Sequence, residues 1–420
     1  MRHFYTLMWC LALPLVLARL WWRGRNEPGY RQHWRERLGC YGPATSAQHT
    51  LWVHAVSVGE TRASEPLVDA LLAAYPDSRI VLTHMTPTGR ATGKALFARH
   101  GSRLVQAYLP YDLPSLVRRF ISHFGPRVCI LMETEVWPNL IAACGTQVPV
   151  ALVNARLSER SLRRGRKFGT IMTDAAQALA LVAAQTEADA ARVRSLGATN
   201  VAVTGSVKFD VVVPPQMVET GALWRERAGA RKVLLCASTR DGEEAMILDA
   251  CAPWLAQDSN ALLVIVPRHP QRFDEVATAI TTRGLSLQRR SAGDSQPWTA
   301  QVLLGDSMGE MFAYYAMCDV AFIGGSLLPL GGQNLIEACA LGKPVLVGPH
   351  TFNFELATQD ALAAGAAVCV ADAIELVTGS RRILVDETER RHMGAAALSF
   401  AGLHRGATAR TVGLLRDIIG

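Results

Sequence analysis

From about residue 50 onward, short apolar runs alternate with longer stretches that have helical spacing. Many of the runs are continuous Val, Ile and Leu, which is typical of strands buried on both faces of a parallel sheet. The longer stretches then supply the helical crossovers between strands. The first series of predicted strands is Thr50–Ala55, Arg79–Thr83, Leu104–Ala107, Val128–Met132, Val148–Asn154, Leu181–Ala184 and Asn200–Val203. The second series is Lys232–Ala237, Ala261–Val266, Ser286–Arg289, Gln301–Leu304, Val320–Gly324, Pro344–Val347 and Ala367–Val370.

A proline-containing break separates the two series. Pro214 and Pro215 lie in the stretch Asp210–Met217, where we predict a stiff linker. The pattern therefore predicts two doubly wound α/β domains facing a cleft, with ligands bound at the carboxyl ends of the strands. At about 150 residues per domain, a chain of 420 residues is long enough for both. A last helix after about Arg405 is expected to pack back on the first domain.

The first 24 residues are expected to attach the chain to a membrane. Phe4 to Ala18 carry no charge, and Trp21 and Trp22 extend the apolar stretch beyond Arg19. A spanning helix needs ~20 residues, so the sequence leaves open whether this helix crosses the bilayer or lies in its interface. The arginines that follow it place the rest of the chain in the cytoplasm by the positive-inside rule. A cleaved signal peptide is the alternative, but the sequence has neither its charged start nor an A-x-A-like site.

Composition narrows the class of protein. Half of the residues are hydrophobic and 19% are charged, which excludes a disordered chain. Of the net charge of +7, residues 1–45 contribute +5 through seven Arg and two Glu. This basic collar favours anionic lipid or a phosphorylated amphiphile rather than nucleic acid. The nine cysteines form no CxxC pair and no zinc-spaced cluster, so we expect buried reduced thiols and no metal site.

The first candidate for acid–base chemistry is Glu60, in the stretch His54-Ala-Val-Ser57-Val-Gly59-Glu60. The stretch follows a predicted strand and opens a helix, so Glu60 lies in the first helical turn. A carboxylate there can simply stabilise the helix dipole. At a strand end that faces a cleft, the same carboxylate is a candidate general base.

A second candidate is the carboxylate pair Glu133 and Glu135, directly after another apolar strand. Two carboxylates in three residues are costly to bury together, which favours acid–base chemistry or charge stabilisation in a cleft. The alternative is an ordinary helix entry with Pro138 in the first turn.

Turns suited to phosphate recur in the second half of the chain. Each follows a predicted strand, and a small-residue turn before a helix N-terminus is a common anion site. The turns are Ala237–Arg240, Pro267–Pro270, Gly324–Ser326 and Gly331–Asn334, the last of which leads into a predicted helix Leu335–Leu341. Glu337 in that helix is placed to accept hydrogen bonds from ribose hydroxyls. The Walker A, GxGxxG and Asp-x-Asp patterns are absent from the sequence, so we expect cationic side chains and backbone N–H groups to meet the phosphate charge.

Two further basic features have competing interpretations. One segment is crowded with basic residues, which form either a solvated helix face or a contact with a phosphorylated lipid headgroup. They are Arg156, Arg160, Arg163, Arg164, Arg166 and Lys167. Lys208 lies close to the predicted linker and is either an ordinary surface lysine or a residue of the cleft.

Taken together, these segments resemble the 3-deoxy-D-manno-oct-2-ulosonic acid (Kdo) transferases, the lipid A glycosyltransferase family. The matching stretches run in one order over nearly the whole chain, which makes the resemblance specific. They are PGYRQHWRERLG, HAVSVGE, METEVWPN, VNARLSERS, TGSVKFD, ASTRDGEE, VPRHPQRF, DSMGEM and FIGGSLLPLGGQNLIEACALGKPVLVGPHTFNF.

The resemblance implies a GT-B fold of two Rossmann-like domains. It implies a membrane anchor at residues 1–24, an acceptor domain at 25–210, a CMP-Kdo domain at 211–405 and a returning helix at 406–420. The implied reaction moves Kdo from CMP-Kdo to the tetraacyldisaccharide lipid A precursor (lipid IVA) with inversion and without a cofactor, at the cytoplasmic side of the inner membrane. Another GT-B nucleotide-sugar transferase or epimerase, and an inactive membrane-anchored scaffold, are the alternatives.

The resemblance also implies roles for individual residues. Glu60 would be the base, and Glu133 with Lys208 would stabilise the transition state, Glu135 being the alternative carboxylate. The helix N-terminus at Asn334 would help Lys208 to stabilise the departing phosphate. The implied CMP-binding residues are Arg268, His269, Met308, Gly309, Glu310, Asn334, Leu335, Ile336 and Glu337.

Overall fold

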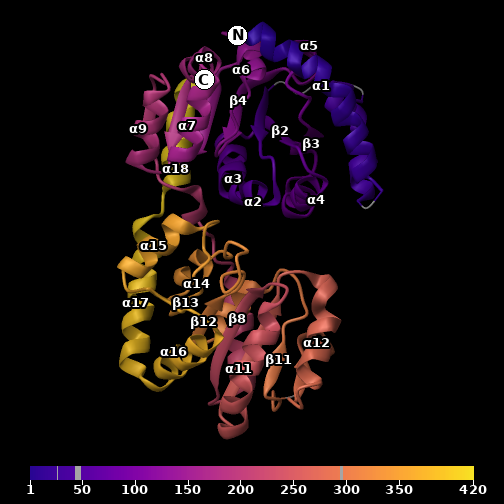
Figure 1. The fold of residues 1–420 in the computed structure, drawn as a ribbon. Coiled ribbons are helices and arrows are strands. Elements are labelled where there is room, and N and C mark those ends of the chain that lie inside the picture. The colour runs from indigo at the N-terminus through magenta and orange to yellow at the C-terminus, as the bar shows by residue number, and fades with distance from the viewer. Residues whose placement is uncertain (26, 43–48, 294–296) are drawn as a thin grey trace. The chain divides into compact units, whose positions relative to one another are not determined.

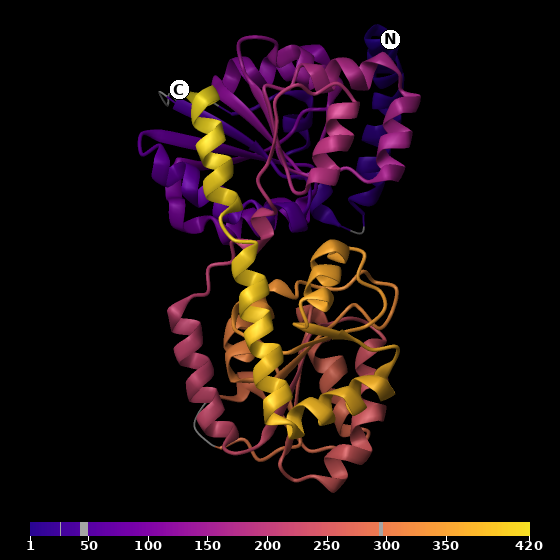
Figure 2. The same cartoon turned by 90° about the vertical axis from the view of Figure 1, so that its left-hand side faces the viewer.

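A computed structural model describes residues 1–25, 27–42, 49–293 and 297–420. The chain divides into two compact units, one formed by 1–210 with 405–420 and the other by 211–404 (Figures 1 and 2). The elements of the first unit are α1 (Arg2–Arg23), η1 (Pro28–Arg31), η2 (Trp34–Leu38), β1 (His49–His54), α2 (Val58–Ala63), α3 (Glu65–Ala74), β2 (Ser78–His84), α4 (Pro87–Leu96), η3 (Ala98–Arg103), β3 (Leu104–Tyr108), α5 (Pro114–Phe124), β4 (Pro126–Met132), α6 (Pro138–Cys144), β5 (Val150–Ala155), α7 (Glu159–Lys167), α8 (Thr170–Gln177), β6 (Leu181–Ala184), α9 (Glu187–Ser195), β7 (Val201–Val203), η4 (Val207–Phe209) and α18 (Ala407–Ile419).

The second unit holds the remaining elements. They are α10 (Pro215–Ala228), β8 (Lys232–Thr239), α11 (Glu243–Gln257), β9 (Ala261–Pro267), η5 (Pro270–Arg272), α12 (Phe273–Thr281), β10 (Leu287–Arg289), η6 (Arg290–Ala292), β11 (Val302–Leu304), α13 (Met311–Met317), β12 (Val320–Ile323), α14 (Ile336–Ala340), β13 (Val345–Val347), α15 (Glu355–Ala363), β14 (Ala367–Cys369), α16 (Ala373–Val385) and α17 (Glu387–Leu403).

The sheet of the first unit has seven strands in the order β3-β2-β1-β4-β5-β6-β7. All of its pairings are parallel, and helices cover both faces. The strand order reverses direction between β1 and β4, where His54 is in register with Leu131. These two strands therefore end level, and the loops that follow them begin side by side at the switch point, where doubly wound sheets bind ligands.

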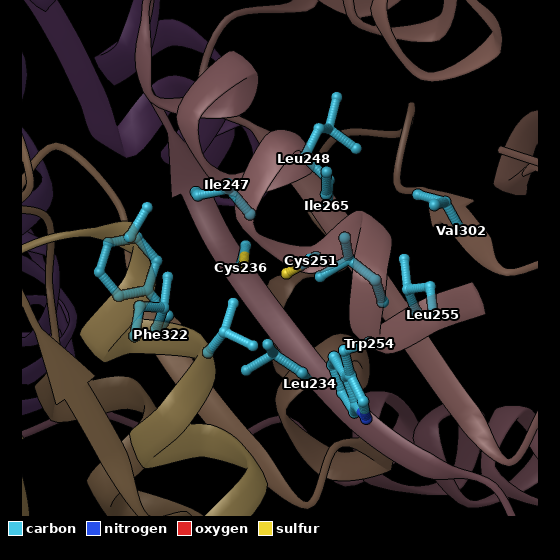
Figure 3. Close-up of a cluster of buried hydrophobic side chains, with 14 of the residues drawn as sticks. Leu234, Cys236, Ile247, Leu248, Cys251, Trp254, Leu255, Ile265, Val302 and Phe322 are labelled. Carbon is cyan, nitrogen blue, oxygen red and sulfur yellow. The ribbon is translucent and has the colours of Figure 1, made fainter. Parts of the chain in front are cut away.

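The sheet of the second unit repeats this plan. Its order is β10-β11-β9-β8-β12-β13-β14, again with only parallel pairings, and it reverses between β8 and β12. One face packs on α11, α12 and α16 through a core that includes Cys236, Ile247, Trp254 and Phe322 (Figure 3). The continuous apolar strands are thus buried on both faces, and the predicted α/β fold with two doubly wound parallel sheets is confirmed.

Helix α18 returns to the first unit, where Leu415 and Ile419 are buried in the same core cluster as β1 and α3 (Figure 2). Its first turn is held by Asp210, whose two carboxylate oxygens accept the backbone N–H groups of Gly406 and Thr408. A carboxylate at a helix N-terminus satisfies donors that have no partner within the helix.

Three details differ from the sequence predictions. Pro214 and Pro215 do not form a stiff linker but begin α10, because proline suits the first turn of a helix, where no N–H is needed. The predicted helix Leu335–Leu341 is the shorter α14, with only five residues. All nine cysteines are free thiols, but Cys10, Cys40 and Cys369 are exposed.

Candidate active site

Glu60 is fixed by the turn between β1 and α2. The Ser57 hydroxyl caps α2 by accepting the Glu60 N–H at 3.4 Å, and it donates to Glu60 Oε1 at 3.3 Å. The other carboxylate oxygen, Oε2, accepts the Val56 N–H at 2.8 Å. This arrangement resembles a capping box, except that the carboxylate accepts the N–H of Val56, one residue before the N-cap Ser57. Glu60 thus stabilises the start of α2 and is also the candidate base. The two interpretations of this residue, a structural one and a catalytic one, are compatible.

Burial raises the pKa of Glu60 to about 7. The Val56 N–H opposes the shift by stabilising the ionised form, while the charges of Glu135 and then Glu133 add to it. A carboxylate with a pKa near neutrality is partly ionised at physiological pH and is a stronger proton acceptor than an ordinary glutamate. Glu60 therefore has the properties that a general base requires.

Glu133 follows β4 with a left-handed backbone, φ +57°. Left-handed φ in a residue other than glycine is uncommon and costs about 1 kcal/mol or more. The conformation occurs together with an ion pair in which Lys208 Nζ lies 2.8 Å from Glu133 Oε1. Both side chains are largely shielded from solvent, with exposures of 23% and 18%. Lys208 is therefore not an ordinary surface lysine.

Glu135 has a different partner from Glu133. Its Oε2 accepts the indole N–H of Trp137 at 2.9 Å, and burial raises its pKa. Of the two carboxylates in the stretch, Glu133 is the one that the structure pairs with Lys208.

Asn154 connects the parts of this site, although no motif in the sequence gave it a role. It is fully buried at the end of β5 and also has a left-handed backbone, φ +53°. Its Oδ1 accepts the Val207 N–H at 3.2 Å, and its Nδ2 lies 3.5 Å from Glu133 Oε1. Because Val207 begins η4, which carries Lys208, Asn154 holds both partners of the ion pair. The signal in the sequence was an asparagine at a strand end, a residue that tolerates left-handed backbone.

In the second unit, the turn Gly324–Ser326 does not offer a free anion site, and this expectation was wrong. Glu243 is fully buried and accepts four backbone N–H groups. The donors are Gly325 at 2.6 Å, Arg240 at 2.9 Å, and Ser326 and Leu327, each at 3.0 Å. A carboxylate of the chain itself thus occupies the N–H cluster at the β8–β12 switch point, the kind of cluster that binds phosphate in other proteins.

Close packing explains the glycine that begins this turn. A methyl group added to Gly324 would lie 2.6 Å from both Ser238 O and Thr239 Cα at the end of β8. Glu244, beside Glu243, is also buried and binds Thr239 Oγ1 at 2.8 Å and Arg272 at 2.7 Å. The acidic pair in the stretch ASTRDGEE therefore shapes the turns after β8 and β12.

The residues expected to hold CMP follow three strands of the same sheet. Arg268 and His269 come after β9, the segment Met308–Glu310 comes after β11, and Asn334–Glu337 comes after β12. Because all strands are parallel, the three segments begin at one edge of the sheet. The pKa of His269 is lowered by its partial burial and by the charges of Arg240, Arg268 and Arg272, which shows that cationic side chains gather there.

These residues differ in what they can offer a ligand. Leu335 and Ile336 have buried side chains, with 1% exposed, so only their backbone can contact a nucleotide. Asn334 Oδ1 accepts the Ile336 N–H at 3.0 Å, and its Nδ2 donates to Glu337 Oε1 at 3.1 Å. Glu310 is paired with Arg290 at 3.0 Å.

The segment Met308–Glu310 also has exposed positions. Met308 is 54% exposed, and Gly309 has φ +83° with no atom within 4 Å of the position that a Cβ would take. Within the described residues, no group of three or more His, Cys, Asp and Glu is arranged to hold a metal ion.

The first unit also carries the basic segment noted above. Arg160, Arg163, Arg164, Arg166 and Lys167 are exposed on or beside α7, and Leu162 is the residue of that helix that is buried. Arg156 precedes the helix and is half-buried.

Two doubly wound parallel α/β units are the arrangement of the GT-B class, and comparisons with known proteins agree. A UDP-GlcNAc 2-epimerase from Neisseria meningitidis has a similar fold, with a TM-score of 0.55 at 16% identity over 88% of this chain and all of that one. Residues 32–211 match the family model described as 3-deoxy-D-manno-octulosonic-acid transferase (kdotransferase). The 3-deoxy-D-manno-octulosonic acid transferase of Bordetella pertussis is 46% identical over all of both chains. That of Haemophilus influenzae is 36% identical over all of this chain and 99% of its own. The chain belongs to the Kdo transferase family and is a glycosyltransferase.

Proposed function

We propose that this enzyme transfers Kdo from CMP-Kdo to the tetraacyldisaccharide lipid A precursor, lipid IVA, with inversion at the anomeric carbon. The observation that carries the proposal is Glu60, a carboxylate with a pKa of about 7 that is raised in part by the charge of Glu133, the partner of Lys208 in an ion pair. A sugar hydroxyl has a pKa far above neutrality, so its attack on the donor needs a base that accepts the proton as the new bond forms.

The proposed reaction is a single displacement. The acceptor hydroxyl attacks the anomeric carbon of Kdo, the bond from that carbon to the CMP phosphate oxygen breaks, and the hydroxyl proton passes to Glu60. Charge separates in an oxocarbenium-like transition state, as in glycoside hydrolysis. Lys208, held by Glu133, would stabilise the negative charge that develops on the leaving group. A single base is sufficient, and the chain forms no covalent intermediate.

The donor would bind at the carboxyl edge of the second sheet. Arg268 and His269 would contact the phosphate, Met308–Glu310 the nucleoside, and Asn334–Glu337 the ribose, with Leu335 and Ile336 contributing only backbone groups. Because Glu243 already occupies the N–H cluster after β12, the phosphate would rely on cationic side chains at the end of β9 instead. We assign the acceptor to the first unit, residues 25–210, and the donor to residues 211–405.

Attachment to the cytoplasmic side of the inner membrane follows from the acceptor, because a tetraacyl lipid does not leave a bilayer readily. Among the described helices, α1 is the one that is long and apolar enough to cross a membrane, judged by length and composition. The basic collar after it suits an acceptor that carries phosphate groups.

The test is Glu60→Gln in purified full-length enzyme with CMP-Kdo and lipid IVA. We expect transfer to be lost while CMP-Kdo binding, measured by calorimetry, stays within about threefold of the wild type. Glu65→Gln is the matched control, since Glu65 lies in the next helix and pairs with Arg99. If Glu60→Gln kept more than a few per cent of the wild-type rate, the assignment of the base would be wrong.

The alternatives are tested by binding and product analysis. A GT-B enzyme with another donor would bind UDP or ADP more tightly than CMP in the same calorimeter. An inactive scaffold would release no CMP from CMP-Kdo in the presence of acceptor. Mass spectrometry of the product gives the number of Kdo units that are added.

A further inference from the structure

Helix α1 has two distinct faces, although nearly all of its residues are apolar. Half-buried residues recur at helical spacing along one face, which we call the inner face. These residues are Tyr5, Thr6, Trp9, Ala12, Leu13, Val16, Leu17 and Leu20. Four of them, Trp9, Leu13, Val16 and Leu17, pack against a cluster formed by Tyr111, Leu113 and Leu116, and the Trp9 and Tyr111 rings lie 5.9 Å apart.

Polar contacts hold the inner face to the first unit. The Tyr5 hydroxyl donates to Asp112 Oδ2 at 2.9 Å. Asn139 Nδ2 donates to Thr6 Oγ1 at 3.0 Å. The other oxygen of Asp112 accepts the Leu140 N–H at 2.7 Å, so Asp112 joins α1 to the start of α6.

Both ends of α1 have contacts within the first unit. At its start, a methyl group placed on Gly169, just after α7, would lie 3.0 Å from Met1 Cε. At its end, Arg31 Nε donates to Trp21 O at 3.2 Å, and the Arg31 guanidinium lies 4.4 Å from the centre of the Trp21 ring. The helix therefore packs on the first unit from Tyr5 to Leu17, and its last turn contacts η1.

The opposite face of α1 is apolar and open to solvent. Its residues, which we call the outer stripe, again follow helical spacing and are exposed by 48–74%. They are Phe4, Leu7, Met8, Leu11, Leu15 and Trp22. Such a contiguous apolar surface is costly in water and marks an interaction site.

A bilayer crossing is incompatible with this packing. If α1 spanned the hydrocarbon core, the residues bound along it would enter the core as well, including Asp112 and Asn139, which are 1% exposed. Drawing buried charged and polar groups of a folded unit into lipid is strongly unfavourable. In addition, a spanning helix would place Met1 across the membrane from the folded unit, whereas Met1 lies beside Gly169, just after α7.

Positive charge lies at both ends of the outer stripe. Arg19, Arg23 and Arg25 are exposed at the end of the helix. Arg163, Arg164 and Lys167 are exposed on α7, which ends two residues before the Gly169 that contacts Met1. An apolar stripe with cations at both ends suits the surface of a membrane that contains anionic phospholipid.

We infer that α1 lies in the plane of an anionic membrane surface, with the outer stripe among the headgroups and upper acyl chains, and does not cross the bilayer. The inference rests on the packing of α1 and is independent of which sugar donor and acceptor the enzyme uses. The first unit is then held at the membrane surface. This unit includes the start of α6 and the preceding stretch that carries Glu133 and Glu135.

Site-directed labelling distinguishes the two orientations. Full-length protein in which Cys10, Cys40 and Cys369 are replaced by Ser would carry one new cysteine, at His3 before the stripe or at Glu226 on the exposed side of α10. In inverted inner-membrane vesicles, a membrane-impermeant maleimide should label both His3→Cys and Glu226→Cys without detergent. If His3→Cys reacted only after detergent treatment while Glu226→Cys reacted at once, α1 would cross the bilayer and the inference would fail.

A second experiment separates the two faces of the helix. We expect Leu11→Asp together with Leu15→Asp to reduce co-flotation with vesicles of phosphatidylcholine and phosphatidylglycerol at least tenfold while the Tm stays within about 2 °C. Leu13→Asp, on the inner face, should instead lower the Tm. Removing phosphatidylglycerol from the vesicles should weaken binding of the unchanged protein. Unchanged flotation of the double variant, or equal binding to neutral vesicles, would contradict a stripe that lies on an anionic surface.

Discussion

The ammonium group of Lys208 lies 2.8 Å from Glu133 Oε1, and the two residues come from segments more than seventy positions apart in the sequence. The pair is held by a strand end with left-handed backbone on one side and by η4 on the other. An ion pair that is mostly shielded from solvent holds its lysine in a fixed position, as a group that stabilises a leaving phosphate must be.

Lys208→Met should therefore lower kcat by about 10²–10³-fold, the usual effect of removing one preorganised stabilising group. CMP-Kdo affinity should change little, because the charge acts mainly on the transition state. The measurement is steady-state release of CMP with saturating donor. Lys167→Met, on the exposed end of α7, is the matched control and should keep wild-type kcat.

A double-mutant cycle tests whether Glu133 acts through Lys208. We expect Glu133→Gln to lower kcat and the double variant with Lys208→Met to be no worse than Lys208→Met alone, since residues that act as a unit are not additive. Additive losses would show that Glu133 has a separate role, and Glu135→Gln would then be the next variant to measure.

Asn154 should behave as a positioning residue. Asn154→Gly keeps a backbone that tolerates φ +53° but removes both side-chain hydrogen bonds, so we expect kcat to fall about tenfold or more with little change in donor KM. Asn154→Ala should be less stable than Asn154→Gly by about 1 kcal/mol, because alanine pays for left-handed backbone. Urea unfolding gives that comparison. A kcat unchanged in Asn154→Gly would mean that η4 holds Lys208 without it.

Much of this architecture can be predicted from the sequence, and the reason is physical. Strands buried on both faces need unbroken apolar runs, so runs such as Ala261–Val266 predicted strands whose observed ends differ by at most two residues. Glu60, Glu133 and Lys208 could be singled out because each follows a predicted strand or lies near the predicted boundary between domains. Residue types alone do not reveal that Lys208 pairs with Glu133 and not with Glu135. The pairing occurs with a left-handed backbone at Glu133, where φ is +57°.

Two features could not be predicted for opposite reasons. In α1 both faces are mostly apolar, so periodicity carries little signal, and only packing shows that Tyr5 and Leu13 face the first unit while Leu11 and Leu15 face outward. The turn at Gly324 carried a strong signal for an anion, but the anion is Glu243, eighty-one residues earlier in the chain. A turn rich in N–H donors predicts a negative partner without saying whether that partner is a ligand or a side chain.

Glu243 should accordingly be essential for the second unit. Glu243→Gln leaves one oxygen acceptor and adds an amide that can only donate, so several of the four N–H groups lose their partner. We expect a loss of about 3 kcal/mol in the free energy of unfolding, typical of a disrupted buried charged network, together with weaker CMP binding. Glu226→Gln, exposed on α10, is the control and should leave both unchanged. A variant as stable as the wild type would show that the turn does not depend on the carboxylate.

The pKa of Glu60 predicts an unusual dependence of both activity and stability on pH. Activity should fall on the acid side with an apparent pKa of about 7, because the protonated carboxyl cannot accept the proton of the acceptor hydroxyl. Stability should change in the opposite direction. The folded state holds the proton up to a pKa of about 7, whereas the unfolded chain releases it near 4.5, so folding is favoured at low pH and this contribution is lost as the pH rises through 7.

Glu60→Gln removes the ionisable group while keeping an oxygen that can accept the Val56 N–H. We therefore expect the variant to be more stable than the wild type by about 1–2 kcal/mol at about pH 8, a value reduced for solvent screening of a half-buried group, and to gain nothing near pH 4.5. Urea unfolding at the two pH values measures the difference directly and needs no substrate. A gain that was equal at both pH values would show that the proton equilibrium of Glu60 is not its cause, and the proposed base would then lack the raised pKa on which its role depends.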